Sequence, residues 1–443
     1  MSFASSVGSL ELSSRGSTET LKISSGIYVR LSRQLRGEPL FPQLKRLCIT
    51  DYHRLVDYLP LFFSSNLQTV QFSSAKSPAV SGATASVVKT LICDFSEWSQ
   101  EVQHLRITQG IILPISLLDS ISLLGNLRIL NLSPIQVGDF QEFRPLAPLA
   151  LESLTLGLSC SSYIRLPDPV TLLPDFLALL EKLDISGPSI VIADFVQSLG
   201  TQRLTSLTVE SESEVQASAG AVASKHGPLK GKKKPSTSIQ TKNVDHRISD
   251  FRSILQTISS RWADSLRRMS INSCDVPIDF SALSNVPLLE KLYVSHFTID
   301  GLERALKPTG VWCHLVTLCL TMTITFPLLS LIALSAHHLK ELDLSIDASQ
   351  APLTENHQVL AHPLNLLKIH GPYSTNSGWA LGWAPIDLPL CSQIARYLNA
   401  LFPGMKELTS TSQVGTWETV WQLVVFCRTT RDDDCRRPVY ARD

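Results

Sequence analysis

The segments Leu127–Leu132 (LRILNL) and Leu151–Leu156 (LESLTL) share one pattern, with large apolar residues at the first, fourth and sixth positions. Leu180–Ile185 (LEKLDI) repeats it. In an extended strand successive side chains point to opposite faces, so the fourth and sixth residues share one face, and the third and fifth share the other. The pattern therefore predicts a strand that is buried on one face and free on the other.

The pattern returns along the chain at a regular interval. Further copies begin at Leu44, Leu67, Val102, Leu204, Leu266, Leu289, Leu315, Leu339 and Leu364. Eight of the eleven intervals between successive first positions are 23 to 26 residues long, which is the period of leucine-rich repeats. A degenerate copy at Thr18–Ile23 is expected to open the series, and Met405–Leu408 is expected to close it.

One such repeat cannot bury its own apolar face, so repeats stack and share a core. We therefore expect an α/β fold, a leucine-rich-repeat solenoid or horseshoe with a parallel concave sheet and convex helices. Segments with helical apolar spacing lie between the strands. The expected helices are Arg54–Phe63, Thr84–Phe95, Ile115–Leu124, Val170–Leu179, Ile192–Leu199, Leu302–Leu306, Pro327–Ala336 and Ile394–Leu401.

The same spacing predicts the organisation of the chain. Residues 18–427 are expected to form the solenoid of about 13 repeats. Residues 1–17 are expected to be disordered, and residues 428–443 to form a polar tail. The interval of 62 residues from Leu204 to Leu266 is too long for one repeat, so a disordered insertion is expected at 210–247, where Ser, Ala, Lys and Thr dominate. Helical spacing resumes near Ile248.

Composition narrows the class of protein. The 443 residues carry a net charge of zero and 44% hydrophobic residues, which argues against general disorder and against a basic nucleic-acid-binding face. No apolar run suits a secretory signal or a bilayer span, so no membrane partner is expected. The nine cysteines include no Cys-x-x-Cys pair. We therefore expect the cysteines to be free thiols and the protein to lie in a reducing compartment, the cytoplasm or the nucleus.

The run Lys230–Lys234 lies inside the expected insertion and has three interpretations. It could be a nuclear localisation signal, a contact for an acidic partner, or a solubilising run in a disordered loop. We favour the third.

Catalytic motifs are absent from the sequence, including Gly-x-Ser-x-Gly, His-Glu-x-x-His and phosphate-binding glycine loops. We therefore expect no enzyme activity and no cofactor. One ring of the His337–His338 pair is expected to pack and the other to face solvent, with no metal bound. Asp432–Asp434 lies beside Arg428 and Arg431, which favours a solvated tail over a cation site.

The remaining candidate site is the concave face, where third and fifth positions have no role in the core. A broad curved face suits a protein partner better than a small molecule. For any single residue the alternative is a role in solubility alone. The candidate partner-binding residues are Arg46, His104, Arg106, Lys182, Asp184, Arg268, Lys291, Tyr293, Glu341, Asp343 and Lys368, with Asn131 beside them.

Phe41–Leu47 (FPQLKRL), Leu179–Leu183 and Leu288–Leu292 (both LLEKL), followed by Ala395–Met405 and Trp417–Cys427, resemble the leucine-rich-repeat region of fungal F-box proteins. The resemblance implies that the last segment is a capping helix. It also implies a chain that presents a substrate on its concave face to a ubiquitin ligase built on a Skp adaptor and a cullin. No F-box is expected within residues 1–17, because they cannot hold a module of roughly 40 to 50 residues.

We therefore expect a non-enzymatic scaffold for protein–protein interaction, with substrate recognition for such a ligase as one role. The alternative is a regulatory leucine-rich-repeat adaptor or inhibitor with no ubiquitin link. An enzyme is the least favoured reading, because it would need a pocket of converging polar groups that the sequence does not reveal.

Overall fold

The structure is a computed structural model in which the chain divides into two compact units, residues 1–228 and 229–443. It describes residues 6–13, 25–36, 38–50, 56–73, 83–160, 175–211, 237–273, 279–295, 299–306, 312–348, 360, 362–370, 387–411 and 414–436. The expected opening copy Thr18–Ile23 and the run Lys230–Lys234 lie outside the described residues.

In the first unit the described strands lie in chain order and pair in parallel. They are β1 (Ser9–Ser13), β2 (Arg46–Thr50), β3 (Thr69–Ser73), β4 (His104–Pro114), β5 (Ile129–Gln136), β6 (Ser153–Ser159), β7 (Lys182–Gly187) and β8 (Ser206–Ser211). The helices between them are α1 (Ser25–Leu35), η3 (Val56–Phe62), α2 (Ala83–Trp98), α3 (Leu117–Ile121), η4 (Phe140–Leu146) and α4 (Ser189–Ser198).

The second unit has the same organisation. Its described strands are β9 (Arg268–Asn272), β10 (Lys291–Ser295), β11 (Thr317–Ile324), β12 (Glu341–Ile346), β13 (Leu366–Ile369) and β14 (Glu407–Ser410). Its helices are α6 (Thr237–Arg261), η5 (Phe280–Asn285), α7 (Ile299–Leu306), α8 (Phe326–Ser335), α9 (Leu388–Leu401) and α10 (Val414–Arg436).

The strands pair so that equal motif positions stand side by side. The fourth position Leu47 of β2 pairs with Val70 of β3, which pairs with Leu105 of β4. In the second unit Leu292 of β10 pairs with Leu318 of β11. Each repeat therefore adds one strand in register to its neighbours, and the expected fold class, an α/β leucine-rich-repeat solenoid with a parallel sheet, is confirmed.

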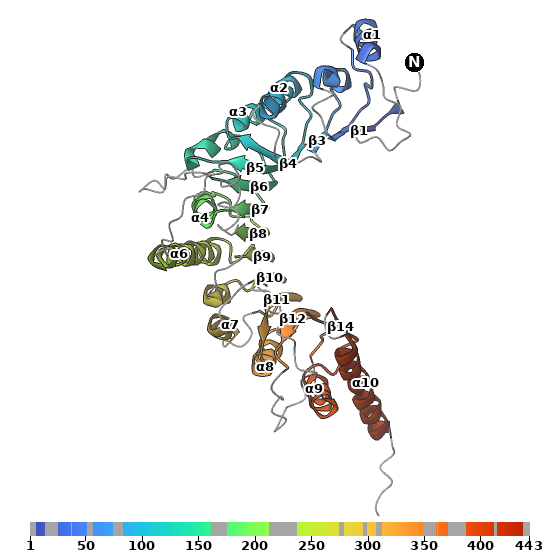
Figure 1. Cartoon of the computed structure of the whole chain (residues 1–443), viewed down its shortest axis with the longest axis vertical. Helices are drawn as coiled ribbons and strands as arrows, with labels where there is room; N and C mark the ends of the chain where they lie inside the picture. Colours follow the sequence, from blue (N-terminus) through green and yellow to red (C-terminus); the bar gives the residue numbers. More distant parts are fainter. Residues whose placement is uncertain are drawn as a thin grey trace, which may run out of the picture. The chain divides into compact units, whose positions relative to one another are not determined.

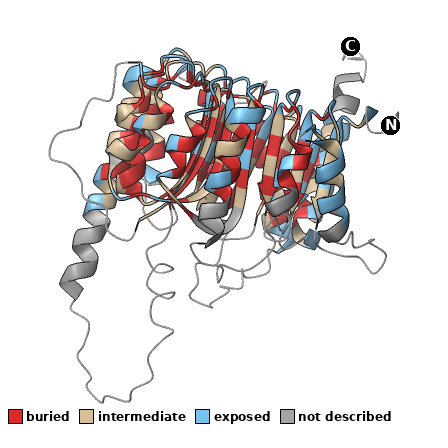
Figure 2. Ribbon diagram, turned by 90° about the horizontal axis from the view of Figure 1, so that it is seen from above, coloured by how far each residue is buried: buried red, intermediate tan, exposed pale blue. Residues whose placement is uncertain are grey.

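Helices cover one side of each sheet (Figure 1). In α2 the residues Val88, Leu91, Ile92 and Phe95 are buried, a spacing that places them on one helical face toward the sheet. Buried residues lie along the strands and on the helices that flank them (Figure 2). We call the side of each sheet that faces away from these helices the open face.

Buried polar side chains join neighbouring repeats just before the first motif position. Each donates a hydrogen bond to a backbone carbonyl of the preceding repeat, which links the two repeats and gives the buried side chain a partner for its own donor. In the first unit these bonds are Ser64 Oγ to Pro42 O (2.6 Å), Ser99 Oγ to Ser64 O (2.9 Å) and Thr201 Oγ1 to Leu180 O (2.8 Å). In the second unit they are Trp312 Nε1 to Leu283 O (3.4 Å), Ser335 Oγ to Leu306 O (2.6 Å) and His362 Nε2 to Ala336 O (2.9 Å).

The first strand corrects the expected boundary of the repeats. Residues 1–17 were expected to be disordered, but β1 lies at Ser9–Ser13 and pairs with β2. Its Leu10 and Leu12 pair with Leu47 and Ile49, so this segment carries the fourth and sixth motif positions. The parallel pairing with β2 stabilises this segment. Its Ser- and Gly-rich neighbours in the sequence had led to the prediction of disorder.

Two helices also extend beyond their expected limits. Helix α6 begins at Thr237, inside the expected insertion 210–247, whose residues 212–236 lie outside the described part. Its predicted apolar face is confirmed, since Phe251, Ile254 and Ile258 are buried. Helix α10 continues to Arg436, so the described part of the expected tail at 428–443 is helical. The helix expected at Val170–Leu179 is wrong over residues 175–179, which form turns.

Candidate functional site: the open face of each sheet

Strand alternation decides which side chains reach the open face. In β2 the side chains of Leu47 and Ile49 are fully buried, whereas Arg46 is exposed and Cys48 is half-buried. Because neighbouring strands are in register, the third positions form one row across the sheet and the fifth positions form a second row.

Three of the predicted residues of the first unit lie within three adjacent strands. Arg46 pairs with Thr69 and Thr69 pairs with His104 in the third-position row. The Nδ1 atom of His104 lies 3.4 Å from Thr69 Oγ1. Arg106 stands in the fifth-position row, two strands from Cys48. Arg46, His104 and Arg106 are all exposed, so the structure brings them together on the open face.

The electrostatics of Cys48 reflect this arrangement. Burial raises the pKa of the Cys48 thiol, and Glu11 on β1 raises it further, while Arg46 and Arg106 lower it. Both arginines therefore act on the space above Cys48. From β2 to β4 the third- and fifth-position rows of the described strands contain Arg46, His104 and Arg106 and no carboxylate, so this part of the open face is basic.

Lys182 and Asp184 lie apart from that basic area. They belong to β7, where they pair with Ser153 and Thr155 of β6. Both are exposed. Strands β5 and β6 separate them from His104 and Arg106, and present the half-buried Asn131 with uncharged neighbours. The structure therefore places all five predicted residues on the open face but divides them into two groups.

The second unit brings two cations side by side. Arg268 of β9 and Lys291 of β10 are direct partners in the third-position row. Arg268 is exposed, and Lys291 is half-buried. Tyr293, in the next outward position of β10, retains 40% of its exposure. Burial raises the pKa of Tyr293, with Cys319, Glu341 and Asp343 acting in the same direction and Arg268 acting against them.

Acidic residues follow two strands away, on β12. Glu341 pairs with Thr317 of β11 and is exposed. Asp343 is half-buried, and its carboxylate contacts Nε2 of His370. The other ring nitrogen of His370, Nδ1, lies 3.0 Å from Thr411 Oγ1. Lys368 of β13, the partner of Asp343 in the fifth-position row, is exposed.

Cys319 completes this polar cluster, which the sequence did not reveal. Burial raises the pKa of the Cys319 thiol to about 11, with Asp343 contributing through its charge and a hydrogen bond. A nucleophilic cysteine needs a depressed pKa, so this Cys–Asp–His arrangement does not provide an activated thiol. Cys319 occupies the fifth position and His370 follows the sixth, so a search that included every outward position would have found both.

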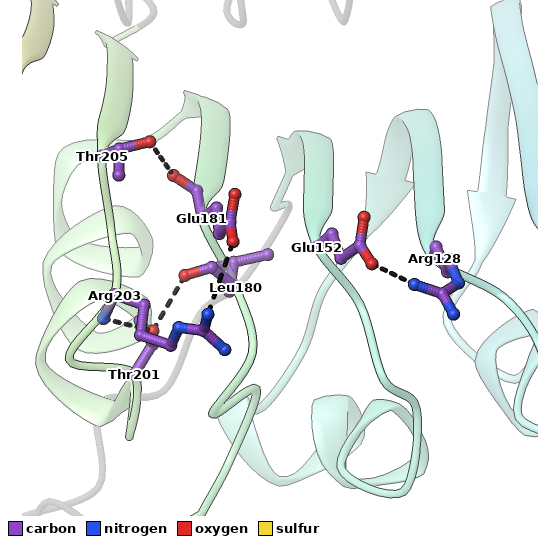
Figure 3. A network of polar contacts seen from close by, with 7 residues as sticks. All are labelled: Arg128, Glu152, Leu180, Glu181, Thr201, Arg203 and Thr205. Atoms are coloured by element: carbon purple, nitrogen blue, oxygen red, sulfur yellow. Dashed lines mark hydrogen bonds and ion pairs between the residues drawn. The ribbon is translucent and has the colours of Figure 1, made fainter.

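Opposite charges pair along the edge where the chain enters the strands (Figure 3). Arg128 forms an ion pair with Glu152, and Arg203 with Glu181 at 4.0 Å. In the second unit Arg267 Nη1 lies 3.0 Å from Glu290 Oε1. These residues occupy the second motif positions of neighbouring repeats, except Arg203, which precedes the first position Leu204. Exposed pairs of this kind contribute roughly 0 to 1 kcal/mol each.

Outside these rows the structure changes one expectation. His337 and His338 are both exposed, whereas one ring was expected to pack. Both lie in the turn after α8, where the buried position is taken by Ala336. Within the described ranges no group of three or more His, Cys, Asp or Glu side chains is placed to hold a metal ion. No described helix combines the length and apolar character that crossing a bilayer requires.

Comparison with known proteins gives likenesses in structure only. No protein-family model and no curated protein matches the sequence. The structure is similar to an internalin from Listeria monocytogenes, at 13% identity over 78% of this chain and 83% of that one, with a TM-score of 0.37. It is also similar to a leucine-rich-repeat-containing protein from Legionella pneumophila (12% identity, 64% and 85% covered, TM-score 0.30). A third is a leucine-rich-repeat protein of Leptospira interrogans (15% identity, 91% and 96% covered, TM-score 0.30).

Proposed function

We propose that this protein is a non-enzymatic scaffold that binds a protein partner on the open faces of its repeats. The observation that carries the proposal is the composition of the outward rows. Arg46, Arg106 and Lys182 in the first unit and Arg268 in the second are exposed on strands whose other face forms the core. Leucine-rich repeats generally bind proteins, because stacked strands offer a broad surface.

A difference between the edge and the open face supports this proposal. Arg128, Arg203 and Arg267 at the edge each lie beside a carboxylate. Arg46 and Arg106 have no ion pair with any of the described residues. Charges at the edge are thus paired within the chain, whereas Arg46 and Arg106 on the open face remain available for an external partner.

The resemblance to the repeats of fungal F-box proteins suggests a finer form of the proposal. The chain would hold a substrate for a ubiquitin ligase built on a Skp adaptor and a cullin, in the cytoplasm or nucleus. The alternative is a regulatory adaptor or inhibitor with no ubiquitin link. Recovery of the Skp adaptor and the cullin with the protein separates the two.

The test is affinity capture from a native extract followed by mass spectrometry. The full chain is compared with a variant in which Arg46, Arg106, Lys182 and Arg268 are changed to Glu. A matched control changes Lys89, Arg144, Arg252 and Arg396 to Glu, because these four residues are exposed and lie on helices. Both variants carry the same change in net charge.

A partner recovered with the unchanged chain and the control, but lost with the open-face variant, supports the scaffold proposal. Equal loss in both variants would mean that net charge alone governs capture, and it would contradict the proposal. Recovery of the Skp adaptor and the cullin would favour the ligase form, and their absence from an otherwise specific capture would favour the adaptor form.

A further inference from the structure

Two like charges stand directly opposite each other on the open face of the second unit. Arg268 and Lys291 are cross-strand partners, and neighbouring strands lie about 4.8 Å apart. Like charges at opposed positions of a sheet are destabilising. Neither cation has an ion pair with any residue that the structure describes. The arrangement therefore places two cations side by side with no compensating anion among the described residues.

The adjacent position of the same two strands shows the opposite arrangement. Arg267 and Glu290, one residue earlier in each strand segment, form an ion pair with Nη1 3.0 Å from Oε1. Opposite charges are therefore paired where the chain enters β9 and β10, and like charges are adjacent one residue further along. This contrast points to an external anion as the partner of Arg268 and Lys291.

A free carboxylate lies further along the same row. The third-position row runs from Arg268 to Lys291, Thr317 and Glu341. Thr317 is only 6% exposed, so no side chain of this row protrudes between Lys291 and Glu341. Tyr293 belongs to the fifth-position row of β10, a strand that lies between β9, which carries Arg268, and β12, which carries Glu341.

We propose that this row of the second unit binds an extended segment of a protein partner that carries acidic residues and a basic residue at a fixed separation. The acidic residues would face Arg268 and Lys291, and the basic residue would face Glu341. This proposal rests on the proposed function and specifies the chemistry of the partner.

The register sets the separation. Two strand spacings from β10 to β12 are about 10 Å, and three spacings from β9 are about 14 Å. An extended chain advances about 3.3 Å per residue. The acidic and basic residues of the bound segment are therefore about three or four residues apart. The phenol of Tyr293 offers a hydrogen bond and an apolar ring to the residues between them.

The experiment measures binding of the full chain to an array of synthetic serine–glycine peptides. Each peptide carries a Glu–Glu pair and one Arg, at separations from about one to eight residues and in both orders. A second set carries an Arg–Arg pair and one Glu. The variants are R268E/K291E, the charge-swapped R268E/K291E/E341R, and the control R252E/R396E, whose changes lie on exposed helical positions.

The proposal requires the unchanged chain and the control to bind the Glu–Glu set best at separations of about three or four. R268E/K291E should lose about tenfold in affinity, and the charge-swapped variant should prefer the Arg–Arg set at the same separations. This gain of preference also shows that the swapped variant is folded. Binding without dependence on separation, or without a change of preference in the swapped variant, would overturn the proposal. The scaffold proposal would still stand if extract capture remained sensitive to the open face.

Discussion

The guanidinium of Arg428 on α10 donates a hydrogen bond of 3.1 Å to the carbonyl oxygen of Phe402, at the end of α9. A second donor of the same group bonds the carbonyl of Met405, and the guanidinium lies 5.4 Å from the centroid of the Trp421 ring. Arg428 was expected in a solvated tail, but it is half-buried. Arg428 therefore holds α10 against the final repeat, because it donates hydrogen bonds to carbonyl groups at the exposed end of the core.

Replacement of Arg428 by Ala should therefore loosen the end of the second unit. Two charge-assisted hydrogen bonds are lost, each of which contributes roughly 1.5 to 3 kcal/mol. Hydrogen exchange should rise in β13 and β14 relative to β10. Arg396→Ala provides the control, since Arg396 is exposed on α9. Equal exchange in both variants would show that Arg428 does not fasten the helix.

Gly187 should tolerate no side chain. Its φ of +139° is rarely adopted by other residues, and an added Cβ would lie 2.5 Å from Leu158 O. Gly187→Ala should destabilise the first unit by about 2 to 4 kcal/mol, measured by urea unfolding. Gly125→Ala is the matched control, because a Cβ at Gly125 meets nothing within 4 Å. If the two variants unfold at the same urea concentration, Gly187 does not pack closely against Leu158.

His362 should make the stability of the second unit depend on pH. Its Nδ1 accepts the Leu364 N–H at 3.2 Å, so its Nε2 carries the proton donated to Ala336 O. Burial lowers the pKa of His362 from 6.5. The unfolded chain therefore takes up a proton at a higher pH than the folded chain. Stability is complete above the unfolded value of 6.5 and is lost as the pH falls below it.

The measurement is the free energy of unfolding of the unchanged protein and of His362→Gln between about pH 5 and 8. The unchanged protein should lose up to about 1.4 kcal/mol more per pH unit below the unfolded pKa than the variant does. Identical pH profiles would show that the buried ring does not titrate between the two states.

The strands of this fold could be predicted from the sequence because their pattern is local. Leu130 and Leu132 are buried for the same reason as Leu154 and Leu156, namely the alternation of side chains along a strand. Strand β1 carries the same local pattern, with Val7, Leu10 and Leu12 at the first, fourth and sixth motif positions, but its Ser- and Gly-rich surroundings favoured the prediction of disorder. Pairing with β2, which no local pattern encodes, is what orders it.

For the candidate site, the sequence could predict only which side chains point outward from the sheet. Alternation indicated correctly that Arg46, Arg268 and Glu341 face outward. It could not indicate that Asp343 pairs with His370, because that contact joins different repeats. The contacts of Arg428 could not be predicted for a related reason. Its partners are backbone carbonyl groups, which every residue type has, so the sequence does not show which carbonyl groups bind it.

We expect the protein partner to bind the open face and not the helices. The most direct test places a photo-reactive amino acid at Gln71 or Thr155, which face outward on β3 and β6, or at the exposed Lys89 of α2. Each protein is irradiated in the native extract that yields the captured partner. We expect cross-linking of that partner from Gln71 or Thr155 and none from Lys89. Cross-linking from Lys89, with none from the two strand positions, would contradict this expectation.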